Sequence, residues 1–196
     1  MNDFIAQILV VTAQVIIIAA MLSQYIKIVT SKTVKGLSGW AYTLATGSVI
    51  AWTVYGYKKG LVVYYISHIL TTLIYFGILG HFYNVSRQRR KMEAYAVISG
   101  IVLLTFFIIL PNYAGWVGLA YTLLARIPQY IHIFKDDNIR GVSSLSYLLL
   151  IIACTCTVIY AAYYNLFPML LSAAITIASS LFIMFMVAKK SLRAYN

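Results

Sequence analysis

Two ionisable side chains, His68 and Arg126, lie within long apolar stretches of the sequence. Ionisable groups are costly inside a bilayer, so by default they indicate a function. An imidazole titrates near neutral pH, and His68 is expected either to contact a substrate or carry a proton, or to be a neutral histidine bonded to a neighbouring helix carbonyl. Arg126 is expected either to hold a substrate carboxylate or to extend its long side chain to the membrane surface.

Enzymatic chemistry has no comparable candidates in this sequence. There is no pair of carboxylates, no cluster of His, Cys and Asp, and no nucleophile that can be placed beside a base. Cys154 and Cys156 are two residues apart in an apolar stretch and would point to different helix faces, which excludes a mutual disulfide and a zinc pair. We therefore expect no catalytic residue, no metal and no cofactor, and a protein that is not an enzyme.

The elements that position these residues are membrane spans. The 196 residues are 62% hydrophobic with a mean hydropathy of +0.87 and only four acidic side chains, which excludes a soluble domain with an ordinary polar surface. Proline and asparagine divide two of the apolar runs, near residue 111 and within residues 163–168. The pattern predicts an all-α membrane protein with seven transmembrane helices. The uncharged runs long enough to cross a bilayer are 4–26, 36–57, 60–86, 94–125 and 141–188.

Basic side chains follow the first, third, fifth and seventh predicted spans, which places all four regions on one side of the membrane. By the positive-inside rule this side is cytoplasmic, so the N-terminus lies outside or in a lumen and the C-terminus in the cytoplasm. Topology thus explains the net charge of +11 without a nucleic-acid partner. The expected partners are a small-molecule substrate and the lipid bilayer, of a bacterial inner membrane or an intracellular organelle. Association into a homo-oligomer is left open.

A duplication relates the first three predicted spans to the last three. RIPQYIHIFKDDNIRGVSSLSY at 126–147 is a near copy of MLSQYIKIVTSKTVKGLSGWAY at 21–42, and the offset of 105 residues continues with more identities than composition alone produces. A unit of three spans starts on one side of the membrane and ends on the other, so a second copy fused directly to it would be inverted. A fourth span between them lets both copies insert in the same orientation. We predict a 3+1+3 arrangement of parallel repeats with a substrate site between them near the midplane. Its parts are residues 1–83, a basic loop and linker helix in 84–112, and residues 113–196 with a basic cytoplasmic tail.

Pro128 and Gln129 lie near the end of the fifth predicted span, and Ser23 and Gln24 are their counterparts in the first. Proline in a helix interior removes a backbone hydrogen bond and frees a carbonyl, for which a nearby amide can be the partner. We expect a hinge at both pairs, where the helix bends near its cytoplasmic end and opens one mouth of a central cavity. A static kink is the alternative.

A glycine and a serine follow each Gln-Tyr-Ile stretch: Gly36 and Ser38 in the first copy, Gly141 and Ser143 in the second. The glycines are typical of turns and the serines of caps on the next helix. Pro-Gln, then an aliphatic-rich turn, then Gly-x-Ser resembles the PQ-loop superfamily, which includes the SWEET and SemiSWEET sugar transporters, cystinosin and lysosomal exporters of cationic amino acids. The resemblance covers residues 8–82 and 114–188 and implies a seven-span membrane transporter.

The segment VIAWTVYGYKKG of the first copy is similar to the second span of the SemiSWEETs. This similarity implies that Trp52 lines the substrate pocket and that Tyr55 and Lys59 close the extracellular mouth. In the second copy Tyr160 matches Tyr55, whereas Thr157 stands in place of the tryptophan.

Two further positions depart from the sugar transporters. Ser67 and Ser172 stand where the family has a sugar-binding asparagine, so the amide contacts to saccharide hydroxyls are lost. Together with Thr157 this favours an amino acid or a related small metabolite over a sugar.

Tyrosine is abundant, with 17 copies in 196 residues. We place Tyr42, Tyr113, Tyr147 and Tyr163 at the membrane interfaces, where amphipathic rings belong. Trp52 and Tyr75 are deeper and are the candidates for an aromatic cavity wall, with packing the alternative for Tyr75.

The repeat and the resemblance favour a transporter that moves a small polar solute by alternating access. No Asp or Glu lies within a predicted span, so passive facilitation is a simpler expectation than proton coupling. A SWEET-type sugar facilitator is one alternative. Another is a receptor that binds without transport, as the KDEL receptors do with charged cavity residues, for which this chain offers Arg126 and Lys59.

Overall fold

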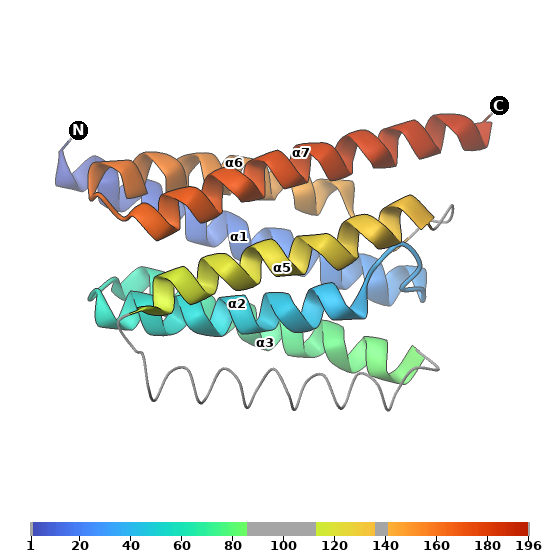
Figure 1. Ribbon diagram of the computed structural model, residues 1–196, viewed down its shortest axis with the longest axis horizontal. Coiled ribbons are helices and arrows are strands. Elements are labelled where there is room, and N and C mark those ends of the chain that lie inside the picture. The colour runs from blue at the N-terminus through green and yellow to red at the C-terminus, as the bar shows by residue number, and fades with distance from the viewer. Residues whose placement is uncertain (1, 86–112, 136–140, 196) are drawn as a thin grey trace.

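The structure, a computed structural model, describes residues 2–85, 113–135 and 141–195 of the chain. They form six long helices that lie along the long axis of the molecule (Figure 1). The all-α class is confirmed, whereas the fourth predicted span, within 84–112, lies almost wholly outside the described residues. The helices are α1 (Asp3–Ser31), α2 (Gly39–Lys58), α3 (Val62–Val85), α5 (Ala114–Lys135), α6 (Ser144–Tyr163) and α7 (Phe167–Tyr195).

Side-chain caps explain where three of the helices begin. Ser38 and Ser143 are the N-caps of α2 and α6, and each hydroxyl accepts a hydrogen bond from the backbone N–H three residues later, at 3.3 and 3.2 Å. Asn2 caps α1 in the same way. Gly36 has a φ of 82°, a conformation that glycine adopts without steric cost. The predicted serine caps and the turn at Gly36 are thus confirmed.

The helices extend beyond the uncharged runs at their basic ends. α1 continues past Lys27 and α7 past Lys189, because charged residues are compatible with a helix once it has left the apolar layer. Between α6 and α7 the turn consists of residues 164–166. Pro168 lies in the first turn of α7. Backbone N–H groups of the first turn have no partner within the helix, so proline removes no helical hydrogen bond there.

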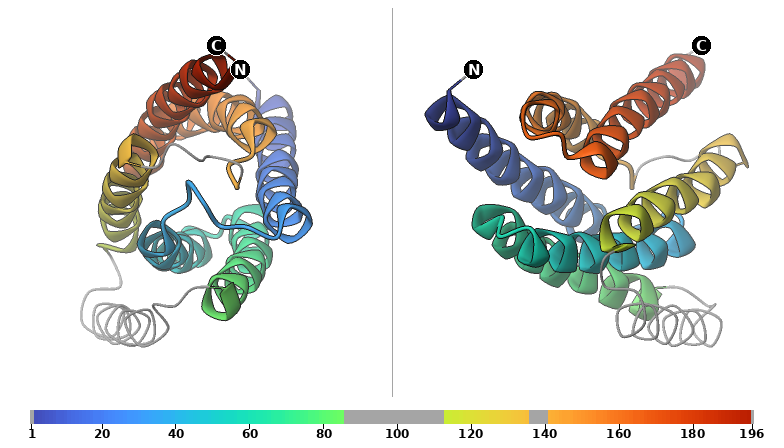
Figure 2. Two further views of the ribbon diagram at one scale, coloured as in Figure 1. Left: turned by 90° about the vertical axis from the view of Figure 1, so that its right-hand side faces the viewer. Right: turned by 60° about the vertical axis from the view of Figure 1, so that its left-hand side comes forward.

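The six described helices form a closed ring. α1 packs against α6 and α3, α2 against α5 and α3, and α7 against α5 and α6. In each set of three, the third helix therefore lies between the other two. The most extensive contacts, α1 with α6 and α2 with α5, join the first three helices to the last three. The view along the bundle shows the helices around a common centre (Figure 2).

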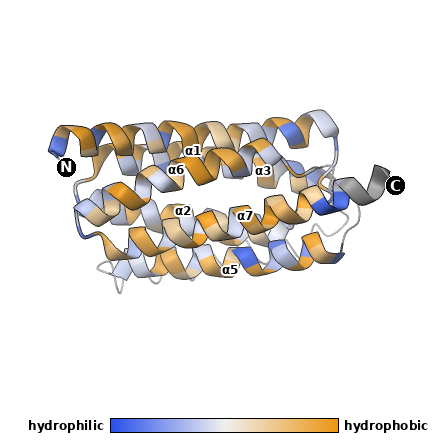
Figure 3. Cartoon of the chain, turned by 90° about the horizontal axis from the view of Figure 1, so that it is seen from above, coloured by the Kyte–Doolittle hydropathy of each residue, from blue (hydrophilic) through white to orange (hydrophobic). Residues whose placement is uncertain are grey.

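Hydrophobic residues predominate along the described helices (Figure 3). Exposed large hydrophobic side chains occur on every described helix, among them Ile8, Leu73, Leu124, Ile152 and Phe185. Such a surface is stable in lipid and not in water. The chain is therefore an integral, multi-pass membrane protein.

Four of the described helices, α1, α3, α6 and α7, are long and apolar enough by length and composition to cross a membrane. α2 and α5 are less apolar because they carry polar residues that face the interior: Thr46 and Ser48 on α2, Thr122 and Gln129 on α5 are all buried. The polar residues of α2 and α5 thus lie in the interior of the ring and not on its outer surface.

Candidate functional site

A cavity of about 170 Å³ lies at the centre of the ring, and all six described helices contribute to its wall. Most lining residues form pairs separated by the repeat offset of 105. The two copies therefore build one site from equivalent positions. These pairs are Ile17/Thr122, Met21/Arg126, Gln24/Gln129, Ala41/Ser146, Tyr42/Tyr147, Ala45/Leu150, Val49/Cys154, Trp52/Thr157, Tyr64/Met169, His68/Ala173 and Thr71/Thr176.

The two sides of the cavity differ chemically although their positions are equivalent. Trp52, Tyr64 and His68, from α2 and α3, form an aromatic wall. The ring centroids of Trp52 and Tyr64 are 6.3 Å apart at 87°, and those of Tyr64 and His68 are 4.1 Å apart at 34°. The equivalent positions on α6 and α7 are Thr157, Met169 and Ala173 and carry no ring, so the aromatic wall belongs to one copy only.

His68 is buried, and its Nδ1 lies 2.8 Å from the carbonyl oxygen of Tyr64, one turn earlier in its own helix. A carbonyl oxygen only accepts, so in the neutral ring Nδ1 carries the hydrogen and Nε2 is an acceptor. One alternative from the sequence was a bond from His68 to a carbonyl of a neighbouring helix. In the structure the carbonyl belongs to α3 itself. Because the ring also lines the cavity, Nε2 is the atom that remains for a solute.

Three hydroxyl groups connect α2, α5 and α7 at the cavity. Ser48 Oγ lies 2.8 Å from Thr122 Oγ1, and the Ser172 hydroxyl donates to the same oxygen at 3.4 Å. Ser48 Oγ also donates to the carbonyl oxygen of Gly118 at 3.0 Å. Their hydrogen-bonding capacity is largely used within the protein, so these groups fix the helices more than they offer free donors.

Arg126 lines the cavity from α5. Its Nη2 donates to Thr176 Oγ1 on α7, at a long 3.4 Å. The side chain thus reaches across to a neighbouring helix at the level of the cavity, which agrees with the substrate-contact expectation better than with extension toward the membrane surface.

At one end of the cavity, Gln24 and Gln129 each bond the Gly-x-Ser loop of the other copy. Gln24 Nε2 donates to the carbonyl oxygen of Gly141 at 2.8 Å, and its Oε1 accepts from the backbone N–H of Ser143 at 3.0 Å. Gln129 makes the same pair of bonds to the loop of the first copy, to Gly36 O at 3.1 Å and from Ser38 N at 3.2 Å. We call these four bonds the glutamine contacts, and this end of the ring the glutamine end.

The glutamine contacts correct the expected role of the amides. Gln129 was expected to be a partner for the carbonyl that Pro128 frees in its own helix, but its amide bonds the other half of the chain. The reason is that both glutamines are buried where α1 meets α6 and α5 meets α2, and the loop backbone between helices has more unmet polar groups than a helix interior.

Ser23 and Pro128, the equivalent residues before the two glutamines, differ in their contact with the loop of the other copy. Ser23, in the place of Pro128, has its Oγ 3.0 Å from Ser143 Oγ. Pro128 lies inside the continuous helix α5 and has no such group. At the glutamine end, the joint of α1 with the loop before α6 therefore has a side-chain bond, Ser23 to Ser143, that Pro128 cannot make in the joint of α5 with the loop before α2.

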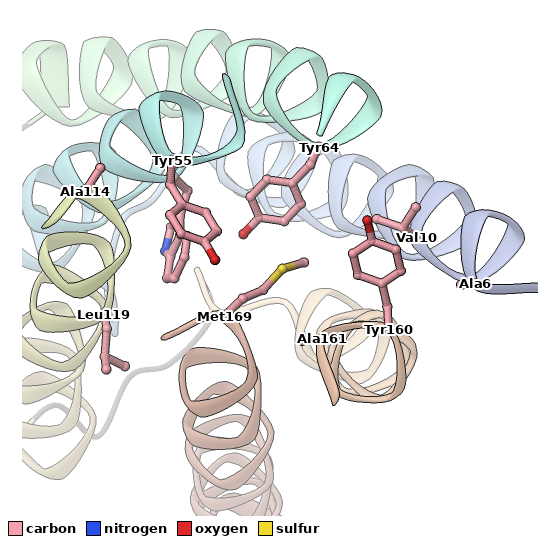
Figure 4. Packing of buried hydrophobic residues seen from close by; sticks show 10 residues of the cluster. Ala6, Val10, Tyr55, Tyr64, Ala114, Leu119, Tyr160, Ala161 and Met169 are labelled. Atoms are coloured by element: carbon pink, nitrogen blue, oxygen red, sulfur yellow. The ribbon is translucent and has the colours of Figure 1, made fainter. Parts of the chain in front are cut away.

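At the opposite end of the ring, where α1 begins, aromatic side chains pack over the cavity. Tyr55, Tyr64 and Tyr160 belong to one buried cluster with Met169, whose side chain extends among the rings (Figure 4). Gly115 and Gly118 on α5 leave the space that Tyr55 and Trp52 occupy. We call Tyr55, Tyr64, Tyr160 and Met169 the tyrosine cluster.

The structure brings most of the predicted site residues together. The cavity wall includes Trp52, His68, Thr157, Ser172, Arg126, Gln24 and Gln129. Tyr55 and Tyr160 lie in the tyrosine cluster, whereas Lys59 is exposed after the end of α2 and is not part of it. Ser67 is buried but is not a lining residue, because its hydroxyl bonds Gln14 Oε1 at 2.6 Å.

Two tyrosines were placed wrongly. Tyr42 and Tyr147 were expected at the membrane interfaces, but both are buried and line the cavity beside the glutamines. Tyr75 also lines the cavity, whereas Tyr113 is exposed. The missed signal was the offset: Tyr42 and Tyr147 are an identical pair in the repeat, which is unexpected for lipid-facing residues.

Comparison with known proteins identifies this arrangement. Residues 110–170, which contain the Pro-Gln and Gly-x-Ser elements of the second copy, match the family model of the PQ loop repeat. The second copy thus carries a PQ loop repeat. A search of curated protein sequences gives no match for this chain.

A solved structure extends the likeness to the whole chain. The structure titled "The 3.7 A resolution structure of a eukaryotic SWEET transporter" is similar with a TM-score of 0.61 and 13% sequence identity. The match covers 91% of this chain and 98% of that chain. At this identity the likeness establishes a SWEET-like fold.

Proposed function

We propose that this PQ-loop protein is a membrane transporter that moves a small polar solute by alternating access. The observation that carries the proposal is the pair of equivalent glutamine contacts below a cavity that both copies line. Equivalent contacts at one end and a tyrosine cluster at the other allow either end to separate while the other stays packed. The fold shared with a SWEET transporter supports the same function.

In this proposal, residues 1–83 and 113–196 are the moving units. A linker helix within 84–112 completes a 3+1+3 arrangement and gives the units the same orientation in the membrane. The basic residues near the glutamine end support a cytoplasmic location for that end. The tyrosine cluster then faces the outside or a lumen, and Tyr55 and Tyr160 serve as the outer gate.

Bending at Ser23-Gln24 and Pro128-Gln129 opens the glutamine end. Proline at position 128 removes the helical bond to the carbonyl of residue 124, so α5 bends there at lower cost than an unbroken helix. When the glutamine contacts break, the loop before α6 moves away from Gln24 together with α6, and the loop before α2 moves away from Gln129 together with α2. The solute leaves through the space between α1, α6, α5 and α2.

The solute class is an amino acid or a related small metabolite in preference to a sugar. Among the described residues, the cavity wall has Ser172 and Thr157 but, apart from Gln24 and Gln129, no amide side chain that could bind saccharide hydroxyls. Its volume of about 170 Å³ is also close to that of a site for one small ring, since an engineered cavity of roughly 150 Å³ binds benzene.

The test is flux into proteoliposomes with a panel of amino acids, sugars and vitamins. Pro128→Ala restores the helical N–H and is expected to slow flux several-fold while the unfolding temperature stays the same or rises. Pro168→Ala is the matched control, because that proline lies in the first turn of α7 and its replacement is expected to leave flux unchanged. If no solute of the panel is bound or transported, the proposal fails.

A receptor that binds without transport is the second candidate, and the position of Arg126 in the cavity wall favours it. A ligand that binds the purified protein and never accumulates in sealed vesicles would establish the receptor in place of the transporter.

A further inference from the structure

Among the residues that the structure describes, the positive charge of Arg126 has no acidic side chain beside it in the cavity wall. Of the four acidic residues of the sequence, Asp3 is the one that is described, and it is not a lining residue. Within the described part of the chain, the hydrogen-bond partner of the Arg126 guanidinium is the neutral hydroxyl of Thr176, at 3.4 Å. A guanidinium has five N–H donors, so most of them remain for another group.

Such a charge is costly unless an anion accompanies it. A charged group in an apolar, water-poor setting loses hydration that one long bond to a hydroxyl does not replace. A bidentate carboxylate matches the planar fork of arginine and restores most of that loss. The free donors of Arg126 therefore suit a ligand oxyanion.

The aromatic wall from α2 and α3 is suited to an apolar or planar body. Trp52 and Tyr64 present ring faces and edges, and His68 presents the acceptor Nε2. A ligand in the cavity would thus meet donors from α5 and rings from α2 and α3.

The duplication shows that Arg126 is not needed to build the ring. The equivalent residue of the first copy is Met21, which also lines the cavity and is buried. The same helix position is therefore occupied by a neutral side chain in the first copy and by a guanidinium in the second. Only the second copy has a charge at this position.

We infer that the cavity selects a small organic carboxylate, which Arg126 holds by its oxygens while Trp52 and Tyr64 pack against its body. This inference rests on the proposed function and names the substrate class. A cation such as a lysine or arginine side chain is rejected, because two positive charges in a low-dielectric cavity repel strongly.

Three isosteric probes test the inference: benzoate, benzamide and benzamidinium, which share one shape and carry a charge of −1, 0 and +1 at neutral pH. Binding to the purified full-length protein in nanodiscs is measured by calorimetry and by the shift in unfolding temperature. Benzoate is expected to bind about tenfold or more tightly than benzamide, and benzamidinium is expected not to bind. Equal affinity for the three probes, or no binding of benzoate, overturns the inference.

Arg126→Met copies the first repeat and is expected to fold normally and to lose the preference for benzoate. Lys27→Met removes one positive charge from the exposed face of α1, and this variant is expected to keep the preference for benzoate. The double variant Met21→Arg, Arg126→Met moves the guanidinium to the equivalent position and is expected to regain benzoate binding in part. If Arg126→Met keeps the preference, the carboxylate is held elsewhere and the inference is wrong.

Flux separates this inference from the proposed function. Accumulation of labelled benzoate in proteoliposomes, lost in Arg126→Met, supports both. Benzoate binding that depends on Arg126 without accumulation supports the carboxylate site and contradicts transport. Flux of neutral solutes that Arg126→Met does not change, together with equal affinity for the three probes, supports transport and contradicts the carboxylate site.

Discussion

Gly118 on α5 lies directly against the indole of Trp52 on α2, so closely that a Cβ at position 118 would be 2.8 Å from Trp52 Cε2. In the equivalent positions of the other copy, Ala13 on α1 is larger than Gly118, and Thr157 on α6 is smaller than Trp52. Glycine on one side and tryptophan on the other thus give a matched contact between α2 and α5, and they place the largest aromatic surface of the cavity.

Gly118→Ala is expected to lower the free energy of unfolding by about 1–3 kcal/mol, because a methyl group is forced into a packed ring. Gly80→Ala is the matched control on α3, where a Cβ has no neighbour within 4 Å, and it is expected to be neutral or slightly stabilising. Thermal and denaturant unfolding in detergent measure both. In a Trp52→Phe background the cost of Gly118→Ala should shrink; equal costs in both backgrounds would contradict the contact.

Gln129→Leu removes two bonds of the glutamine contacts and leaves the Gly36 carbonyl and the Ser38 N–H buried. The expected loss of stability is about 1–2 kcal/mol. The same change at an exposed amide, Asn84→Leu, should cost almost nothing. Unfolding curves of the three proteins give the comparison, and similar losses for Gln129 and Asn84 would show that the contacts do not hold the glutamine end together.

The native thiol of Cys154 lines the cavity and reports the opening of that end. In a Cys156→Ala background, Gln129→Leu is expected to raise the rate at which a membrane-impermeant maleimide labels Cys154 from the glutamine end by several-fold. Gln24→Leu should raise it less, because the bond between Ser23 and Ser143 remains. Labelling rates that do not respond to either change would contradict a gate at these residues.

Ser23→Ala tests the additional bond of the α1–α6 joint directly. Loss of the 3.0 Å contact with Ser143 is expected to cost about 0.5–1.5 kcal/mol and to bring the effect of Gln24→Leu on labelling up to that of Gln129→Leu. Ser31→Ala, whose hydroxyl makes only long contacts near the end of α1, is the control. Should the double variant Ser23→Ala, Gln24→Leu label no faster than Gln24→Leu, the two joints do not differ for this reason.

His68→Phe keeps a ring against Tyr64 and removes the acceptor Nε2 from the cavity. Stability should stay close to that of the parent, because an apolar ring replaces a buried polar one without leaving a partner unmet: the Tyr64 carbonyl also belongs to the helix. Solute flux is expected to fall several-fold. Unchanged flux with unchanged stability would mean that His68 serves packing alone.

Local sequence was enough to predict several parts of this architecture. Gly-x-Ser predicted a turn and a helix cap because the chemistry of both lies within four residues, and the structure has both caps. The offset of 105 predicted that Gln24 and Gln129 are equivalent, as are Trp52 and Thr157, and the cavity contains all four. The rarity of ionisable groups in apolar runs pointed to His68 and Arg126, which also line it.

The partners of the glutamines were not predictable in this way. An amide near a proline has a plausible partner in its own helix, and only the closing of the ring brings Gly141 to Gln24 and Gly36 to Gln129. Tyr42 and Tyr147 were assigned to the interface because a ring near a span end is compatible with lipid headgroups. Which face of the helix points inward depends on the neighbouring helices.

Hydropathy, repeat register and capping are properties of short segments, so the linear sequence sufficed to indicate a membrane protein, a duplication and loops that cap the next helices. Which residues meet at the centre depends on the folded ring: Arg126 in one cavity with the aromatic wall, the exchange of glutamine bonds between copies, and the positions of Ser67 and Lys59 outside the cavity lining. These depend on the order of helices around the ring, and that order is set by packing between segments about a hundred residues apart.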